Sequence, residues 1–264
     1  MGKKSVVVQD TAISYMDEGE GFPIVLLHGF CGSSGYWQEV VPVLTKNYRV
    51  IAPDLPGHGQ SEVLRAPCTM EDLAAIILGF LDELHVQNVI MLGHSLGGYI
   101  TLAFAEKYLD RLKGFSIVHS TAFPDSEEAK KNREANVQRI NQNGIHSFVE
   151  GLVPNLFATE NSNKPYVAAA KEIGYSTSPQ GAMDTLIAMK NRPDRNSVLE
   201  ATGLPVLLIA GENDRIVSPD KTFSVSKTNI KHALIKDAGH MSMYENPEEL
   251  ISIIKKFSDT VFSS

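Results

Sequence analysis

Three side chains of this sequence are of the types that carry out nucleophilic catalysis together. They are Ser95, within the run Gly93–Gly97, and the later residues Asp214 and His240. A serine hydroxyl is a weak nucleophile and needs a neighbouring base. We expect the His240 imidazole to take the Ser95 proton and pass it to the leaving group, while Asp214 fixes the histidine tautomer and stabilises the imidazolium. The three residues predict acyl transfer.

The serine has the setting of a nucleophile elbow, a sharp turn between a strand and a helix. The run GHSLG follows an apolar stretch of strand type, residues 89–92, and opens a helical pattern. On such a turn the serine is strained and its hydroxyl is lifted above the sheet. Side chains at Gly93 and Gly97 would collide with the neighbouring strand and helix, which explains glycine at both positions.

A tetrahedral intermediate also requires an oxyanion hole. One donor is expected to be the backbone N–H of Leu96, directly after the nucleophile. The second is assigned to the N–H of Phe30, in the loop 28–30 that follows the apolar run 24–27. We interpret His28 in the same loop as a structural hydrogen-bonding residue.

The elements that must position these residues alternate between strand and helix patterns. Helical periodicity marks 69–84, 99–109 and 246–258, and strand-like segments open the chain at 6–8 and 12–16. Six further apolar runs lack the alternation of a half-exposed strand: 24–27, 50–52, 89–92, 115–118, 206–209 and 233–235. The pattern predicts an α/β fold with a mostly parallel central sheet and helices on both faces. The three catalytic candidates each follow a strand, so they should meet at one sheet edge.

The alternation fails between residues 122 and 200, which are mostly helical and contain no convincing strand. We expect an α/β core made of residues 1–121 and 201–264, with 122–200 as a helical lid that shapes a pocket. Besides Phe30, seven residues are candidates for its lining, and each type suits a core position equally well: Ser34, Trp37, His119, Phe123, Phe148, Leu152 and Phe157.

Several motifs together resemble the α/β-hydrolase superfamily, specifically its lid-bearing serine esterase-like branch. They cover nearly the whole chain outside the lid: residues 28–30, 54–61, 93–98, 211–214 and 239–240. The resemblance implies that 54–61 is a structural turn and that His58 has no catalytic role. Some relatives place the acid after the strand that precedes the lid, which makes Asp125 the alternative to Asp214. Ser95 argues against relatives that use an aspartate nucleophile.

The leading functional hypothesis is hydrolysis of a small carboxylic ester through an acyl-enzyme. The alternatives on this scaffold are a C–C bond hydrolase, a lactonase, a lyase, a cofactor-free perhydrolase and a non-catalytic ligand receptor. Lyases often have an arginine-rich pocket for an acidic substrate. The predicted lid supplies four arginines, and nothing in the sequence shows that they converge: Arg133, Arg139, Arg192 and Arg195.

Composition limits the partners. The chain has 264 residues, a net charge of −7 and 43% hydrophobic residues, so nucleic acid and anionic membranes are expected to be repelled. No apolar run approaches the ~20 residues of a membrane span, and two cysteines favour a reducing, cytoplasmic compartment. Histidine spacing predicts no metal site and the glycine pattern no cofactor. The expected partner is a small, partly apolar substrate, and the oligomeric state is left open.

Overall fold

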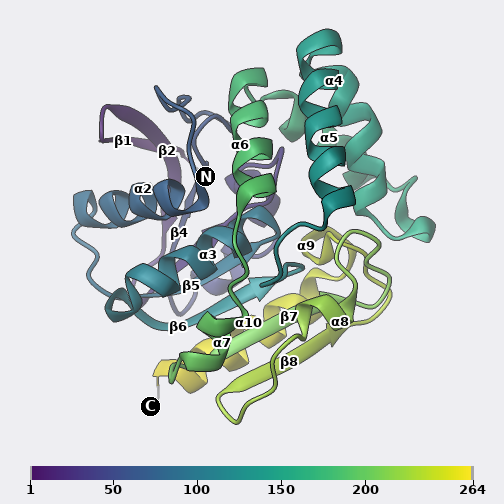
Figure 1. The fold of residues 1–264 in the computed structure, drawn as a ribbon. Coiled ribbons are helices and arrows are strands. Elements are labelled where there is room, and N and C mark those ends of the chain that lie inside the picture. Colours follow the sequence, from purple (N-terminus) through teal and green to yellow (C-terminus); the bar gives the residue numbers. More distant parts are fainter. Residues whose placement is uncertain (1, 263–264) are drawn as a thin grey trace.

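The fold is built on one eight-stranded sheet, which the computed structural model describes over residues 2–262 (Figure 1). The strand order is β1-β2-β4-β3-β5-β6-β7-β8. Only β1 and β2 are antiparallel to their neighbours, and all other pairs are parallel. The eight strands are Lys4–Val8, Thr11–Glu18, Pro23–Leu27, Arg49–Pro53, Val89–His94, Leu112–Val118, Val206–Gly211 and Ile230–Ile235. The predicted mostly parallel α/β sheet is therefore confirmed.

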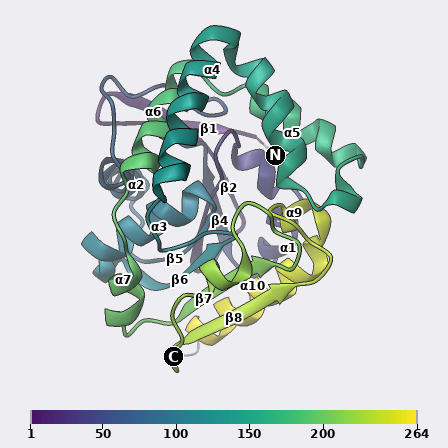
Figure 2. The same cartoon turned by 45° about the vertical axis from the view of Figure 1, so that its right-hand side comes forward.

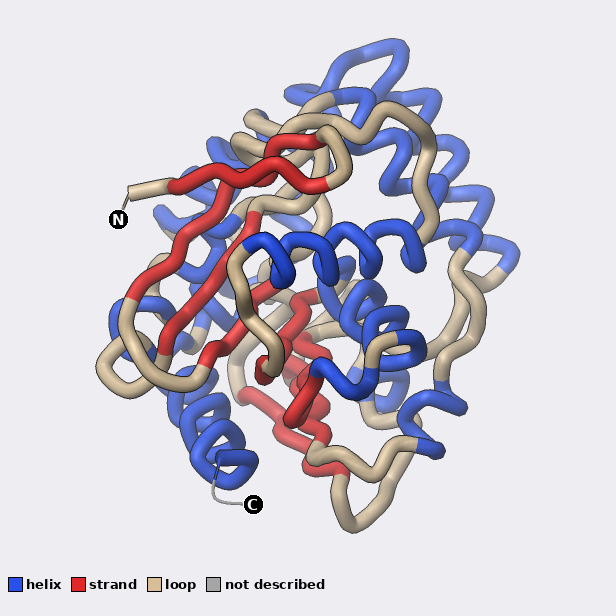
Figure 3. Tube along the Cα trace, turned by 90° about the vertical axis from the view of Figure 1, so that its left-hand side faces the viewer, coloured by secondary structure: helices blue, strands red, loops and turns tan. Residues whose placement is uncertain are grey.

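Helices cover both faces of this sheet. α2 (Met70–Glu83) packs on α3 (Leu96–Lys107), which lies on β5 and β6. α1 (Val41–Leu44) and α10 (Pro247–Phe262) lie on the opposite face (Figures 1 and 2). Figure 3 shows helices beside the central strands, with the strands nearest the N-terminus at the outer edge. The central strands are buried on both sides, which is why they read as continuous apolar runs.

Local signals set the helix limits that the sequence predicts. Thr69 accepts a hydrogen bond from the Asp72 N–H, and the Asp72 carboxylate accepts one from the Thr69 N–H. This capping box starts α2 at the predicted position. The described chain also contains six helical segments of three or four residues: η1 Ser34–Trp37, η2 Leu109–Arg111, η3 Val153–Leu156, η4 Thr159–Asn161, α8 Pro219–Thr222 and α9 Ser242–Glu245.

Between β6 and β7 the chain leaves the sheet and forms a helical insertion. Its α-helices are α4 (Glu127–Leu152), α5 (Pro165–Tyr175), α6 (Pro179–Asn191) and the short α7 (Asn196–Ala201). α4 packs mainly against α6, and its helical geometry is interrupted at Gly144, where φ is +74°. Figure 2 shows α4, α5 and α6 grouped beyond one edge of the sheet. The domain boundaries themselves stay predictions.

In the described part of the chain, no helix is both long enough and apolar enough to cross a bilayer. The cytoplasmic location stays a prediction.

The turn from β5 into α3 is tightly constrained by the backbone around it. Ser95 has φ +50° and ψ −109°, outside the ordinary regions for a residue with a side chain. A Cβ on Gly93 would lie 2.1 Å from the Gly97 carbonyl oxygen, and a Cβ on Gly97 would lie 2.6 Å from the Leu27 carbonyl oxygen. Both obstacles are backbone atoms, so glycine is required at both positions for Ser95 to stand at the strand end.

We expect Gly93→Ala to destabilise the protein because its methyl group has no space. The cost should be about 1–3 kcal/mol or more, as for other overpacked sites, and urea unfolding measures it. Gly203→Ala is the matched control, since a Cβ there meets nothing within 4 Å. Equal stability of the two variants would contradict the steric account of the turn.

Candidate active site

The contact that defines the candidate site joins the loops after β7 and β8. The Nδ1 atom of His240 donates to Asp214 Oδ2 at 2.8 Å, and both side chains are buried. The other carboxylate oxygen, Oδ1, accepts the N–H groups of Ile216 at 2.8 Å and Val217 at 2.9 Å. Asp214 is thereby held in one orientation, and it leaves the His240 Nε2 atom as the nitrogen available for proton transfer.

His119 contacts the same carboxylate. Its Nδ1 atom lies 3.3 Å from Asp214 Oδ2, and its Nε2 atom lies 2.6 Å from the Ser242 hydroxyl oxygen. Burial lowers the pKa of His119, although Asp214 opposes the shift. A neutral ring with its proton on Nδ1 suits both contacts, because Nδ1–H then faces the Asp214 carboxylate and Nε2 accepts from the Ser242 hydroxyl. His119, expected in the pocket wall, thus lies behind the carboxylate.

The charge of Asp214 is strongly stabilised. Burial alone would raise its pKa, but the positive charge that His240 can carry and the hydrogen bonds from His119 and His240 outweigh burial and hold the pKa well below its usual range. An ionised carboxylate beside His240 favours the imidazolium that forms when the ring takes a proton.

Ser95 and His240 line one small pocket of about 70 Å³. His94, the neighbour of Ser95 in the elbow, donates from Nε2 to the His240 carbonyl oxygen at 2.8 Å. This bond ties the His240 loop to the elbow. The remaining lining is largely apolar and comes mostly from the insertion: Phe30, Tyr99, Arg133, Leu152, Leu156, Met189 and Ile216.

The loop expected to supply the second oxyanion donor lies against the elbow. A Cβ on Gly29 would lie 3.4 Å from the Ser95 Cβ and 2.6 Å from His94 Nδ1. Neither the Phe30 nor the Leu96 N–H donates to any acceptor within residues 2–262. Both N–H groups are therefore unused donors among the described residues, and their role as an oxyanion hole stays a prediction.

Two buried histidines support this loop. His28 donates from Nδ1 to the Gly29 carbonyl and accepts the Leu55 N–H at Nε2, both at 2.8 Å. His58 donates from Nδ1 to the Pro56 carbonyl at 3.1 Å. The sequence interpretation of His28 as a structural residue agrees with these bonds, and the 54–61 segment is a turn in which Asp54 accepts the Ser34 and Gln60 N–H groups.

Only some of the residues predicted for the pocket line it in the structure. Leu152 lines it, and Phe148 lies behind Phe30, with 6.0 Å between the ring centroids. Phe123 is 40% exposed. Three others are buried outside the pocket lining: Ser34, Trp37 and Phe157. The alternative acid Asp125 pairs with Arg133 at 3.1 Å and Arg192 at 2.7 Å, whereas His240 bonds to Asp214.

Sequence analysis did not select Tyr99, Leu156, Met189 or Ile216, and it gave Arg133 only as one of four arginines. The three other arginines are not in the pocket lining: Arg192 pairs with Asp125, Arg139 sits 6.0 Å from the Phe148 ring centroid, and Arg195 pairs with Glu71 and Glu106. A signal for Leu156 and Met189 was available, since apolar residues recur along the insertion. That signal does not reveal which of them turns toward the sheet edge.

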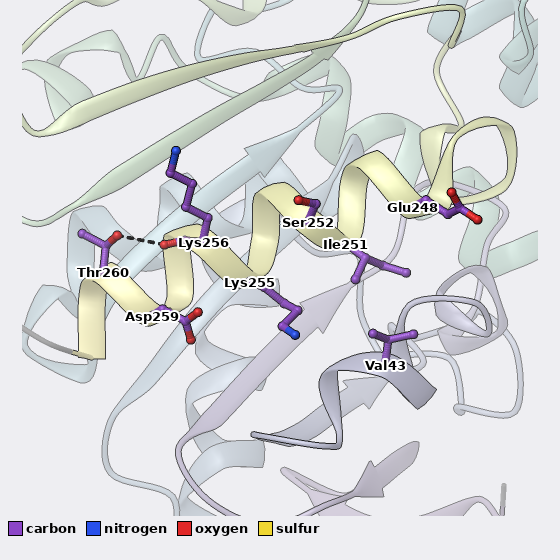
Figure 4. A pocket seen from close by; sticks show the side chains of 8 residues that line it. All are labelled: Val43, Glu248, Ile251, Ser252, Lys255, Lys256, Asp259 and Thr260. Atoms are coloured by element: carbon purple, nitrogen blue, oxygen red, sulfur yellow. Dashed lines mark hydrogen bonds between the residues drawn. The ribbon is translucent and has the colours of Figure 1, made fainter.

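A larger hollow of about 980 Å³ lies away from this site, between α10 and Val43 of α1 (Figure 4). Its lining includes Ser252, Lys255 and Glu248, and Figure 4 shows these side chains at successive points along α10. Among the described lining residues none is histidine or cysteine, so Ser252 has no imidazole base beside it. Size alone does not make this hollow the reactive site.

Within the described chain, His119, Asp214 and His240 are also the side chains whose ligand atoms lie close enough to hold a metal ion, all within 4.8 Å of one another. These atoms already bond to one another through Asp214 Oδ2. A metal would have to displace the hydrogen bond that orients His240. The prediction that the protein uses no metal or cofactor stays a prediction.

Comparison with known proteins places this arrangement in a family. The alpha/beta hydrolase fold family matches residues 23–247, so the chain belongs to that family and is a hydrolase. Among solved structures, a thermophilic esterase from Thermogutta terrifontis is 30% identical, with a TM-score of 0.92 and 99% of each chain covered. An enol-lactonase from Burkholderia xenovorans LB400 shares the fold, with 24% identity, a TM-score of 0.88 and coverage of 97% and 100%.

A curated relative agrees with this assignment. The 3-oxoadipate enol-lactonase 1 of Acinetobacter baylyi is 27% identical over 246 residues, which are 92% of this chain and 91% of the relative. The family and its neighbours fix the reaction class as hydrolysis. They leave the mechanism and the substrate of this chain to be argued from its own residues.

The buried histidines give the stability of the protein a pH dependence. Burial, together with the neighbouring His58, lowers the pKa of His28 to about 3, and burial lowers that of His58 to about 4. An unfolded histidine titrates near ~6.5, so the unfolded chain binds more protons between about pH 4 and pH 6.5. The free energy of unfolding should rise with pH across that window and fall as pH is lowered through it.

We expect His58→Gln to reduce this slope by up to roughly 1.4 kcal/mol per pH unit, the contribution of one proton. Urea unfolding at pH 4.5, 5.5, 6.5 and 7.5 measures it. His58→Asn is a second variant with a donor but no titrating ring. Wild-type slopes in both variants would show that His58 titrates alike in the folded and unfolded chain, against the lowered pKa.

Proposed function

We propose that the protein hydrolyses a small carboxylic ester through an acyl-enzyme formed on Ser95. One observation carries the proposal: the His240 ring, held at 2.8 Å by the ionised Asp214, lines the same pocket as Ser95. A base fixed by a buried acid beside a strained, glycine-flanked serine is the arrangement that activates a hydroxyl for attack on a carbonyl carbon.

The proposed reaction has two halves. Ser95 Oγ attacks the ester carbonyl carbon as its proton moves to His240 Nε2, and the resulting oxyanion accepts hydrogen bonds from the Phe30 and Leu96 N–H groups. The intermediate collapses, the C–O bond to the alcohol breaks, and His240 gives its proton to the leaving oxygen. Water then attacks the acyl-enzyme with the same base, releasing the carboxylic acid and regenerating Ser95.

A lactone is the second candidate substrate, because the curated relative from Acinetobacter baylyi is named an enol-lactonase and aligns over 92% of this chain. A lactone is an internal ester, so the first half of the reaction opens the ring and the leaving alcohol stays attached to the acyl group. The same residues serve both substrates. Turnover of γ-butyrolactone beside p-nitrophenyl acetate and butyrate tells which class is preferred.

Replacing the nucleophile tests the mechanism. We expect Ser95→Ala to lower kcat for p-nitrophenyl butyrate by about 10³-fold or more, because the residual rate comes only from binding and the oxyanion hole. A fluorophosphonate should add its mass to the Ser95 peptide of the wild type alone. Ser252→Ala is the control, since this exposed serine lies in the hollow beside α10. Wild-type turnover in Ser95→Ala would refute the acyl-enzyme.

The role of the acid is tested by a change that preserves its shape. Asp214→Asn can no longer accept hydrogen bonds at both oxygens from fixed donors, so His240 is expected to adopt the wrong tautomer and kcat to fall by about 10³–10⁴-fold. Asp220→Asn, an exposed change in α8 of the same β7–β8 connection, is the matched control and should retain wild-type kcat. Similar kcat values for the two variants would remove Asp214 from the mechanism.

A further inference from the structure

Arg133 brings a permanent positive charge into the pocket of Ser95 and His240, where the other described lining residues carry none. It extends from α4, and its side chain is 25% exposed. Its Nε atom donates to Asp125 Oδ2 at 3.1 Å. The Nη1 and Nη2 groups donate to no protein acceptor within residues 2–262. The N–H groups at the end of the Arg133 guanidinium are therefore available to a bound ligand or to solvent.

The acid beside Arg133 does not neutralise it. Asp125 also accepts from Arg192 Nη1 at 2.7 Å, so two guanidinium groups share one carboxylate. Burial would raise the pKa of Asp125, but Arg133 and Arg192 outweigh burial and keep the acid ionised. Two positive charges face one negative charge, and the surplus lies beside the pocket.

Arg192 does not have the same freedom. It is buried, donates to the Met189 and Phe123 carbonyls, and lies 3.9 Å from the centroid of the Tyr99 ring. These contacts fix Arg192 and, through Asp125, fix the Nε side of Arg133. The free side of Arg133 is consequently presented in a set orientation, which lowers the ordering cost of binding a planar anion.

Around Arg133 the pocket wall is apolar, with Phe30, Leu152, Leu156 and Met189. A cation with unused donors in a small, weakly polar pocket binds an anion more strongly than it would in water. A carboxylate matches the fork of guanidinium N–H groups in size, planarity and charge. The pocket is small, about 70 Å³, so we expect a short chain between that carboxylate and the ester.

We propose that Arg133 binds a carboxylate group of the substrate, so that the ester or lactone cleaved at Ser95 is itself an anion, such as a short half-ester of a dicarboxylic acid. This inference rests on the proposed function for the reaction and adds the class of substrate. Arg133 acts in binding and orientation and takes no part in proton transfer.

The test compares the monomethyl esters of succinate, glutarate and adipate with their neutral amides, in which CONH₂ replaces the free carboxylate at the same size. The wild type should favour at least one acid over its amide by tenfold or more in kcat/KM. Arg133→Gln should lower kcat/KM for that acid by roughly 10–100-fold, the loss of one charged hydrogen-bonded contact. Most of the loss should appear in KM, and the amide should change less than threefold. Arg133→Lys should be intermediate.

Arg139→Gln is the matched control, because this arginine lies on the same helix and contacts Phe148 outside the pocket lining. It should keep the wild-type preference. Equal wild-type rates on acid and amide, or an equal loss on both in Arg133→Gln, would overturn the proposal while leaving ester hydrolysis intact.

A binding measurement keeps the proposal testable if no ester is turned over. Calorimetric titration of glutarate into Ser95→Ala should give a dissociation constant that rises at least tenfold in the double variant Ser95→Ala, Arg133→Gln. Glutaramide should bind the single variant no more tightly than it binds the double variant. If the wild type turns over no ester but glutarate binding depends on Arg133, the proposed function would be contradicted and the carboxylate site would stand. Glutarate binding that is absent or independent of Arg133 would overturn the carboxylate site.

Discussion

The strained turn at Ser95 is the constraint on which the rest of the site depends. A residue with a side chain at φ +50° and ψ −109° has a backbone conformation that costs on the order of 1–3 kcal/mol. The packing around the turn must therefore offset that cost. β5 is hydrogen-bonded to parallel strands on both sides, and α3 packs on β5 and β6. Gly93 and Gly97 allow strand and helix to approach closely. The sheet thereby holds one hydroxyl at its edge.

In the loops around that hydroxyl, burial and neighbouring charges shift the pKa values of the polar groups in opposite directions. Some groups are thereby kept neutral and others are kept charged. Burial lowers the pKa values of His28, His58 and His119, which keeps these rings neutral as hydrogen-bonding supports. Asp214 is also buried, yet its histidine partners and backbone donors keep it charged. The fixed negative charge of Asp214 holds the His240 ring in a single orientation. Under the proposed function, this orientation leaves Nε2 for proton transfer.

The two parts of the chain contribute different things to the pocket. The edge of the sheet presents Ser95, His240 and the loop of Phe30, whereas the helical insertion presents Arg133, Leu152, Leu156 and Met189. Under our proposals the first group performs the chemistry and the second selects the substrate. Changes on the pocket face of α4 and α6 can then alter specificity without disturbing the strained turn.

The sequence by itself determined the sheet and the three catalytic candidates, because strand ends, the elbow glycines and helix caps are local signals. Apolar runs placed β3 to β8, and Thr69 with Asp72 marked the start of α2. It did not determine the pocket wall: Trp37 was expected there and is buried elsewhere, while Met189 was overlooked. Helical periodicity gives a helix an apolar face but not the direction in which that face turns. Only the tertiary packing of α4 on α6 and over the sheet edge decided that Arg133 lines the same pocket as Ser95 and that His119 contacts Asp214, because these residues lie far apart in the chain.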